Sequence, residues 1–288
     1  QDYRAGLRLC AVVIWEWDGV TQKKAIFITG GGSGIGRAIA LYFAERGWFV
    51  GLGDVDAAGM KETERLIANG FCYSRKFDVR DRAAWDEALA AFATAAGGRI
   101  DVMVNNAGIP LGGVLADNTV AEIERCLDIN LKGVLFGAQA VYPYLQKTAP
   151  GSCLLNTSSA AGIYGTPGSS VYSATKFGVR AITEALDGEW AEDGIKSRSL
   201  MPSFIDTPLL KHAPNAATNQ AIETIVRDAG LEITPVLAVA QAAWDAVHGE
   251  KLHTTVGKTA KQLAFGSRWM PERLRRQMRN SRRPLAAR

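Results

Sequence analysis

Two residues near the middle of the chain, Tyr172 and Lys176, carry side chains well suited to proton chemistry. Their spacing places a phenol and an ammonium group on one face of a helix. A tyrosine with its ordinary pKa near 10 is a poor base at neutral pH, and a neighbouring cation lowers that pKa by favouring the phenolate. The pair is equally compatible with an ordinary solvent-facing helix, so its interpretation as a general acid/base depends on its surroundings.

A glycine-rich segment near the N-terminus, Thr29-Gly-Gly-Gly-Ser-Gly-Ile-Gly36, has the composition of a phosphate-binding turn. It follows an apolar strand and opens a helix, so its backbone can approach a pyrophosphate closely. The free N–H groups at the helix start then face the phosphates. We predict that the cofactor-binding residues here are Gly30, Ser33, Gly34, Ile35 and Gly36.

An acidic residue, Asp54, ends the next expected strand, 18 residues after Gly36. A carboxylate at this place accepts hydrogen bonds from the adenosine ribose diol and repels a 2′-phosphate. Its neighbours Gly53 and Val55 are uncharged, and Ser33 stands where a basic residue could have met that phosphate. The sequence therefore favours NAD over NADP, the alternative role of Asp54 being a strand-end cap.

The elements that must position these residues alternate between short apolar strands and longer helices. Strands are expected at 25–29, 49–54, 71–77, 102–105, 153–157, 196–201 and 252–256, and helices at 35–46, 57–69, 82–96, 120–146 and 171–192. Apolar, β-branched strands separated by helices imply a parallel sheet covered on both faces. With no internal repeat or linker, we predict an α/β fold: one Rossmann-type doubly wound sheet of about seven strands over residues 23–260.

One segment, residues 203–234, breaks this alternation with prolines, small polar residues and a short helical stretch around 220–228. It follows a strand at the edge where open α/β sheets bind ligands. We predict a lid over the active site there, the alternative being a surface-packed connection.

Composition excludes several classes of function. Hydrophobic residues make up 47% of the 288, and the net charge of +4 is too small to indicate nucleic-acid binding by the whole domain. The four cysteines have no metal-ligand spacing and the three histidines are unclustered, so we expect no metal site and a cytoplasmic protein with reduced thiols. No apolar run approaches the roughly 20 residues that span a bilayer. We interpret residues 1–22 as a poorly defined N-terminal extension.

Taken in order, the motifs resemble those of the short-chain dehydrogenase/reductase family over roughly residues 23–210. The resemblance is carried by the glycine turn, Asp78-Val79, Asn105-Asn-Ala-Gly108, Asn130, Ser159 and Tyr172-x-x-x-Lys176. Serine at position 33, where epimerase and dehydratase relatives would have glycine, indicates the branch of about 250 residues. The family implies a dehydrogenase or reductase that uses a nicotinamide cofactor.

The resemblance implies four catalytic residues. Tyr172 would exchange the alcohol proton, and Lys176 would hold the nicotinamide ribose and lower the pKa of Tyr172. Ser159, 13 residues before Tyr172, would hydrogen-bond the reacting oxygen, a role for which Ser158 is the rival by composition. Asn130 would anchor a water that passes protons from Lys176 to solvent, the alternative being a helix-interior polar residue.

The family also implies further contacts with the cofactor. Asp78 and Val79 would border the adenine, and the turn containing Asn105, Ala107 and Gly108 would pass behind the nicotinamide. After the sixth strand, Pro202, Ile205 and Thr207 match positions that hold the carboxamide. Ser203 replaces the family's usual glycine and stiffens that turn.

The C-terminal segment, residues 261–288, departs from the family. Eight arginines and one glutamate lie between Arg268 and Arg288, interleaved with Trp269, Met270, Leu274 and Met278 at near-helical spacing. Such a stripe could contact an anionic membrane surface peripherally, although a helix packed on its own domain is the alternative. Because the C-terminal segment typical of tetrameric members is missing, we expect a homodimer built on the helices at 120–146 and 171–192.

The sequence thus predicts an NAD-dependent alcohol dehydrogenase or ketone reductase acting on a hydrophobic secondary alcohol or ketone. The alternatives are an NADP-preferring carbonyl reductase and a nucleotide-sensing Rossmann protein without turnover. The expected pocket wall, Ile163, Tyr164, Phe204, Leu209 and Leu210, is mostly apolar, and no arginine or lysine is evidently placed to hold a carboxylate or phosphate.

Overall fold

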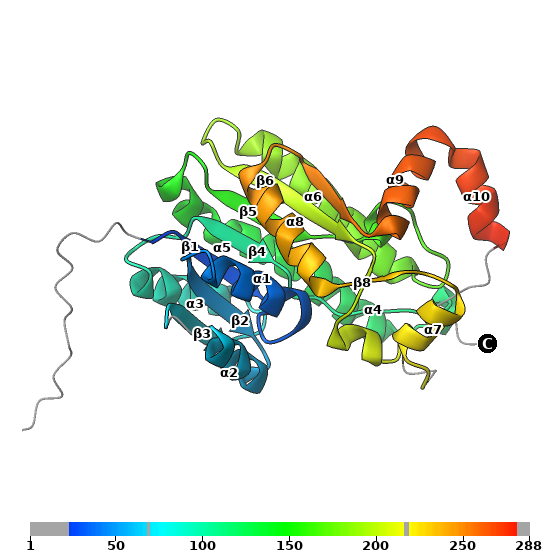
Figure 1. Cartoon of the computed structure of the whole chain (residues 1–288), viewed down its shortest axis with the longest axis horizontal. Helices are drawn as coiled ribbons and strands as arrows, with labels where there is room; N and C mark the ends of the chain where they lie inside the picture. Colours follow the sequence, from blue (N-terminus) through cyan, green and yellow to red (C-terminus); the bar gives the residue numbers. More distant parts are fainter. Residues whose placement is uncertain (1–22, 68–69, 216–218, 281–288) are drawn as a thin grey trace, which may run out of the picture.

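Seven parallel strands form the central sheet, in the order β3-β2-β1-β4-β5-β6-β9 (Figure 1). They are β1 (Ala25–Thr29), β2 (Phe49–Asp54), β3 (Cys72–Lys76), β4 (Val102–Asn105), β5 (Cys153–Thr157), β6 (Lys196–Pro202) and β9 (His253–Val256). The order reverses between β1 and β4, which is the topological switch point where such sheets bind ligands. The predicted doubly wound α/β fold is confirmed.

The structure is a computed structural model that describes residues 23–67, 70–215 and 219–280. The predicted N-terminal extension, residues 1–22, lies outside the described residues, as do the last residues of the basic segment, 281–288.

Helices cover both faces of the sheet because its strands are buried on both sides. In β1, Ile26 and Ile28 pack in one core while Ala25 and Phe27 pack in the other, as alternating side chains on a pleated strand must. The first core is covered by α1 (Gly34–Ala44), α2 (Ala57–Leu66) and α8 (Val236–His248). The second is covered by α3 (Arg82–Ala95), α5 (Gly133–Thr148) and α6 (Ser170–Glu189).

The helices differ from the expectation in two places. The single helix expected at 120–146 is α4 (Val120–Leu127), a π-helical turn (Asp128–Lys132) and then α5. No element was expected between the lid segment and the last strand, yet α8 lies there. Its buried residues Val239, Ala240, Ala243, Ala246 and Val247 follow helical spacing, so the periodicity that identifies it was present in the sequence.

The lid segment forms a small unit of its own at the carboxyl edge of the sheet. It contains β7 (Phe204–Ile205), a 3-10 turn (Pro208–Lys211), α7 (Ile222–Asp228) and β8 (Ile233–Thr234), and β7 pairs with β8. Leu210, Ile222 and Val226 give it a separate apolar cluster. Beyond β9, α9 (Lys258–Trp269) and α10 (Pro271–Asn280) form a helical hairpin, drawn in orange and red in Figure 1.

Candidate active site

A cavity of about 1320 Å³ opens at the carboxyl edge of the sheet. Its lining comes from the segments that follow β1, β2, β3, β4, β5 and β6. It also comes from α4, the π-helical turn, α6, the lid segment and the helices α9 and α10. One continuous cavity therefore joins the glycine-rich turn to Tyr172 and Lys176. The parallel sheet brings together residues separated by more than half of the sequence.

The glycine-rich turn is shaped by close backbone approach. Gly30 and Gly34 have φ values of +67° and +51°, which side chains larger than hydrogen disfavour. Gly36 lies inside α1, where a Cβ would overlap the carbonyl oxygen of Gly30. The turn thus presents bare backbone and the start of α1 to the cavity, a cradle that suits a pyrophosphate.

Asp54 closes the glycine turn as well as facing the cavity. Its Oδ2 accepts a hydrogen bond from the Gly32 amide at 2.9 Å, and its Oδ1 accepts one from the Asp56 amide at 3.0 Å. Arg37 of α1 is committed to the turn: it donates to the Gly32 and Gly59 carbonyls and to Thr63 Oγ1. Arg37 is therefore held by protein acceptors rather than directed at a ribose phosphate.

The turn after β4 ties the two halves of the sheet together. Thr29 Oγ1 accepts hydrogen bonds from the Asn106 and Ala107 amides, and Asn106 Nδ2 donates to the Thr29 carbonyl at 2.9 Å. Asn105 does not line the cavity; its Nδ2 donates to Asn156 Oδ1 and to the Val134 carbonyl inside the second core. Asn105 therefore has a structural role. Its neighbour Asn106, which was not among the predicted site residues, lines the cavity.

At the adenosine end, the two residues predicted to border the adenine are held by neighbours. Trp85 Nε1 donates to the Val79 carbonyl at 2.9 Å, and Arg80 forms an ion pair with Asp78. The hydrogen bonds from Arg80 hold the pKa of Asp78 below its usual range. Asp78 and Val79 both line the cavity.

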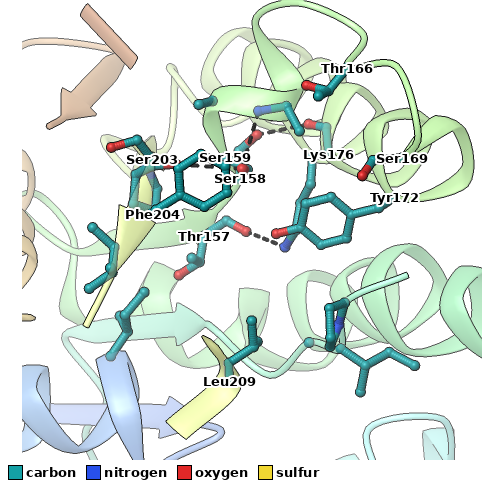
Figure 2. A pocket seen from close by; sticks show the side chains of 18 of the residues that line it. Thr157, Ser158, Ser159, Thr166, Ser169, Tyr172, Lys176, Ser203, Phe204 and Leu209 are labelled. Carbon is teal, nitrogen blue, oxygen red and sulfur yellow. Dashed lines mark hydrogen bonds between the residues drawn. The ribbon is translucent and has the colours of Figure 1, made fainter. Parts of the chain in front are cut away.

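Tyr172 lies on α6 and points into the cavity beside Lys176 (Figure 2). Burial raises the pKa of Tyr172 to about 12, and a hydrogen bond with Ser159 is the influence that lowers it. Lys176 is thus not the dominant influence on this pKa in the protein by itself. The reason is desolvation: removing water from the phenol outweighs a cation whose Nζ is 5.5 Å from the ring centroid.

Lys176 is 5% exposed and anchored at its tip. Its Nζ donates to the Thr157 carbonyl at 2.9 Å, the contact drawn in Figure 2. Burial lowers the pKa of Lys176 to about 8, because an ammonium group loses hydration in this position. The lysine therefore titrates near neutral pH, where it can exchange a proton.

Serines 158 and 159 follow β5 and have separate functions. Ser158 Oγ donates to the Lys176 carbonyl at 2.8 Å, which pins the α6 backbone. Ser159 accepts from the Ala161 amide and hydrogen-bonds Tyr172 from its place at the start of a 3-10 turn (Ala160–Gly162). Ser159 is thus the serine that contacts Tyr172, whereas the Ser158 hydroxyl is engaged by the α6 backbone.

Asn130 lies in the π-helical turn and is fully buried, so it does not line the cavity itself. Its Oδ1 accepts from the Ile109 amide at 2.8 Å and its Nδ2 donates to the Ile109 carbonyl at 2.9 Å. A Cβ on Gly108 would lie 3.2 Å from Asn130 Oδ1 and 3.6 Å from Lys176 Nζ. Gly108 thus leaves the space beside Asn130 and Lys176 free of a side chain. The π-turn, typical of functional sites, puts Asn130 there.

The lid segment (residues 203–234) approaches the glycine-rich turn directly. A Cβ on Gly34 would lie 3.3 Å from Thr207 Cβ, so the glycine turn and the lid approach each other across the cavity. Pro202, Ile205 and Thr207 line the cavity, as do Phe204, Leu209 and Leu210. Ile163 and Tyr164 do not; they pack instead against α9 and α10, which corrects the expected pocket wall.

The C-terminal hairpin is a part of the cavity that sequence reasoning did not place. Leu263, Phe265, Met270, Leu274 and Met278 line it together with Lys261 and Arg273. Leu274 is buried and Met278 packs on the same cluster, so two of the four apolar residues of the predicted membrane stripe face the protein's own core. The amphipathic pattern could be recognised in the sequence, but the protein surface against which its apolar side packs could not.

No helix in the described part of the chain is long and apolar enough to cross a membrane. Among the described residues, no group of histidine, cysteine and acidic side chains could hold a metal ion.

Comparison with known proteins agrees with this geometry. The sequence model of the short chain dehydrogenase family matches residues 24–218. The chain belongs to the short-chain dehydrogenase family. It is 37% identical over 208 residues to the 3-oxoacyl-[acyl-carrier-protein] reductase FabG of Thermotoga maritima, covering 71% of this chain and 83% of that protein.

Two solved structures show the same arrangement. Levodione reductase superposes with a TM-score of 0.74 at 28% identity, covering 84% of this chain and 98% of its own. A 3-ketoacyl-(acyl-carrier-protein) reductase from Brucella melitensis, complexed with NADH, superposes with a TM-score of 0.73 at 26% identity. The match covers 82% of this chain and 98% of that chain. The protein is therefore an oxidoreductase of this family, and the family match ends before α8, α9 and α10.

Proposed function

We propose that the protein is an NAD-dependent oxidoreductase that transfers hydride between the nicotinamide and a hydrophobic secondary alcohol or ketone. The observation that carries this proposal is the convergence of Ser159, Tyr172 and Lys176 on the cavity that the glycine turn enters. The predicted catalytic domain is residues 23–260, with 203–234 as its lid.

The residues present fit a nicotinamide dinucleotide. The bare backbone of Gly30 and Gly34 and the start of α1 would hold the pyrophosphate, and Asp54 the adenosine ribose. Ser33, Ile35, Ala107, Pro202 and Thr207 complete the wall around it. When bound, the nicotinamide would supply the hydride acceptor or donor for the reaction.

The chain's own residues would move the proton. Tyr172 would take the proton of the substrate hydroxyl, or return it to the carbonyl oxygen, while Ser159 holds that oxygen beside the phenol. Lys176, with its pKa near 8, would favour the phenolate and pass protons on. Asn130, placed by the π-turn, would order a water next to Lys176 as an exit to solvent.

Two features support NAD rather than NADP as the cofactor. Asp54 would repel a 2′-phosphate, and Arg37 is engaged by three protein acceptors. The Brucella relative was solved with NADH. The alternative, an NADP-preferring reductase, predicts the opposite ratio of kcat/KM values for the two cofactors.

A carbonyl or alcohol substrate is supported by the names of the relatives, which are 3-oxoacyl and levodione reductases. The apolar lining by Phe204, Leu209, Leu210, Leu263 and Met270 supports a hydrophobic one.

The test is a screen for NADH production or consumption across a panel of alcohols and ketones, repeated with Tyr172→Phe. We expect this variant to bind NADH as the wild type does and to lose turnover. A variant that keeps most of its rate would remove Tyr172 from the mechanism. Failure of every substrate with wild-type NADH binding would instead favour a nucleotide-sensing protein.

For assembly, we propose a homodimer through α4, α5 and α6, on which Leu127, Leu135 and Phe177 are exposed apolar residues.

Cys72, Cys126 and Cys153 are free thiols, which fits a cytoplasmic location. The proposed weak membrane contact now depends on Trp269 and the exposed arginines of α10. Co-sedimentation with anionic vesicles, with and without residues 268–288, tests that contact.

A further inference from the structure

The hairpin of α9 and α10 is fixed to the cavity by its apolar residues. Ala260, Leu263 and Leu274 pack with Ala160, the residue after Ser159, and with Ile163 one turn further on. Leu274 also lies over Gly266, where an added Cβ would be 3.6 Å from Leu274 Cδ2, so the two helices lie close together. The hairpin is therefore a built wall, fixed relative to the catalytic serine.

The charges that line the cavity are distributed unevenly. Its acidic residues are Asp54, which ends β2, and Asp78, which follows β3. Arg80, which is paired with Asp78, and Arg125 of α4 line the same half of the cavity, so that half carries both signs of charge. From β5 onward, the described residues that line it include Lys176, Lys261 and Arg273 but no carboxylate. Lys176 is deep and bonded to Thr157, whereas Lys261 and Arg273 come from the outer hairpin. The substrate half is thus purely cationic, which favours an anion.

Neighbouring carboxylates do not neutralise the two outer cations. Glu272, beside Arg273, forms its ion pair with Arg275 at 3.5 Å. Glu232 accepts a hydrogen bond from the Lys258 amide at the start of α9. Within the described part of the chain, neither Lys261 nor Arg273 has a carboxylate within ion-pair distance, and both side chains are exposed.

We propose that Lys261 and Arg273 form a cationic rim that binds an anionic group of the substrate, remote from the reacting carbon. Between Tyr172 and this rim the wall is apolar, with Phe204, Leu263 and Met270 among its residues. The substrate is then an amphipathic ketone or alcohol: an apolar body with the reacting group at one end and a carboxylate or phosphate at the other. This inference rests on the proposed function, which places the reacting carbon of the substrate beside Tyr172.

The test compares charged and neutral forms of one ketone. A chain-length series of (ω−1)-oxo fatty acids, their methyl esters and the matching phosphate monoesters is assayed for NADH-dependent reduction. The variants are Lys261→Gln, Arg273→Gln and the double variant. The matched control is Arg276→Gln, an exposed arginine on α10 that does not line the cavity. The carboxylate and phosphate arms distinguish the two sources of negative charge.

We expect the wild type to prefer an anionic ketone over its ester in kcat/KM, with a preference that weakens at high salt. The double variant should raise KM for the anion about tenfold while changing the ester little, because it removes both exposed cations that attract the anionic group. Arg276→Gln should resemble the wild type. Equal use of ester and acid by the wild type, or an equal loss in Arg276→Gln, overturns the proposal.

Binding separates this inference from the proposed function. If no ketone is reduced, the proposed function fails, and saturated fatty acids are tested instead for a rise in Tm in the presence of NADH. A rise that the double variant loses and Arg276→Gln keeps supports the rim without any turnover. No rise, or a rise that the double variant retains, refutes it.

Discussion

Replacing Lys176 by methionine should stabilise the protein at neutral pH while abolishing its activity. Lys176 is 5% exposed, and burial lowers its pKa from 10.5 to about 8. Each pKa unit corresponds to about 1.4 kcal/mol, so burying the ammonium group costs the folded state about 3 kcal/mol. Methionine fills a similar volume without that cost, although it leaves the Thr157 carbonyl without its donor.

The pH dependence isolates this effect. Below pH 8 Lys176 is protonated in both the folded and the unfolded chain, and the full cost of burial is present. Between the two pKa values the unfolded chain keeps a proton that the folded protein releases, so wild-type stability rises with pH. Above about pH 10.5 the lysine is neutral in both states and the cost has vanished. Cys126 and Tyr172, with pKa values of about 11 and about 12, stay largely protonated across this window.

The assay is urea unfolding of wild type and Lys176→Met at about pH 7 and about pH 10.5. We expect the free energy of unfolding of the variant, relative to wild type, to fall by about 3 kcal/mol between the two pH values. The exposed Lys61→Met controls for the loss of a surface charge. A relative stability of Lys176→Met that is the same at both pH values would refute the depressed pKa and, with it, the proposed ease of proton transfer.

Three further predictions concern the cofactor end and the hairpin, the first with a glycine on α6 as its matched control. Gly36→Ala should abolish NADH binding, measured by fluorescence titration, and destabilise the protein by about 3 kcal/mol because its Cβ would overlap the Gly30 carbonyl. Gly188→Ala on α6, which has open space, should instead stabilise it by about 0.5–1 kcal/mol. Asp54→Ala should lower the ratio of kcat/KM for NAD to that for NADP by about tenfold or more, and an unchanged ratio would remove its role in selectivity. Leu274→Asp should release α10, seen as faster proteolysis within α10 at unchanged NADH affinity, and it should raise KM for hydrophobic substrates.

Much of the fold was determined by local pattern. The strands β1, β2, β4 and β5 have the predicted bounds, because runs of buried apolar residues between glycines and helix starts are specified locally. The π-turn at 128–132 was not predictable in this way, since its residues are compatible with a continuous helix. Only the tertiary structure shows what the turn does: it places the Asn130 amide against the Ile109 backbone, next to the cavity.

Motif order in the sequence indicated the site residues, but not their electrostatics. The spacing of Tyr172 and Lys176 correctly implied that both lie on α6. The pKa of Tyr172 nevertheless moves upward, because burial acts through every neighbouring atom and not through the adjacent cation alone. Likewise, Asn105 resembles a cavity residue in its motif, yet its amide is used inside the second core.

The sequence by itself therefore determined the strands, the glycine turn and the proton-transfer pair, because each depends on residues close together in the chain. The tertiary structure alone decided what encloses the substrate. Lys261 and Arg273 lie about a hundred residues beyond Ser159, and their place at the cavity follows from Leu263 and Leu274 packing beside Ala160 and Ile163. Such long-range packing leaves no local signal, since an amphipathic helix shows that it has a partner and not which one.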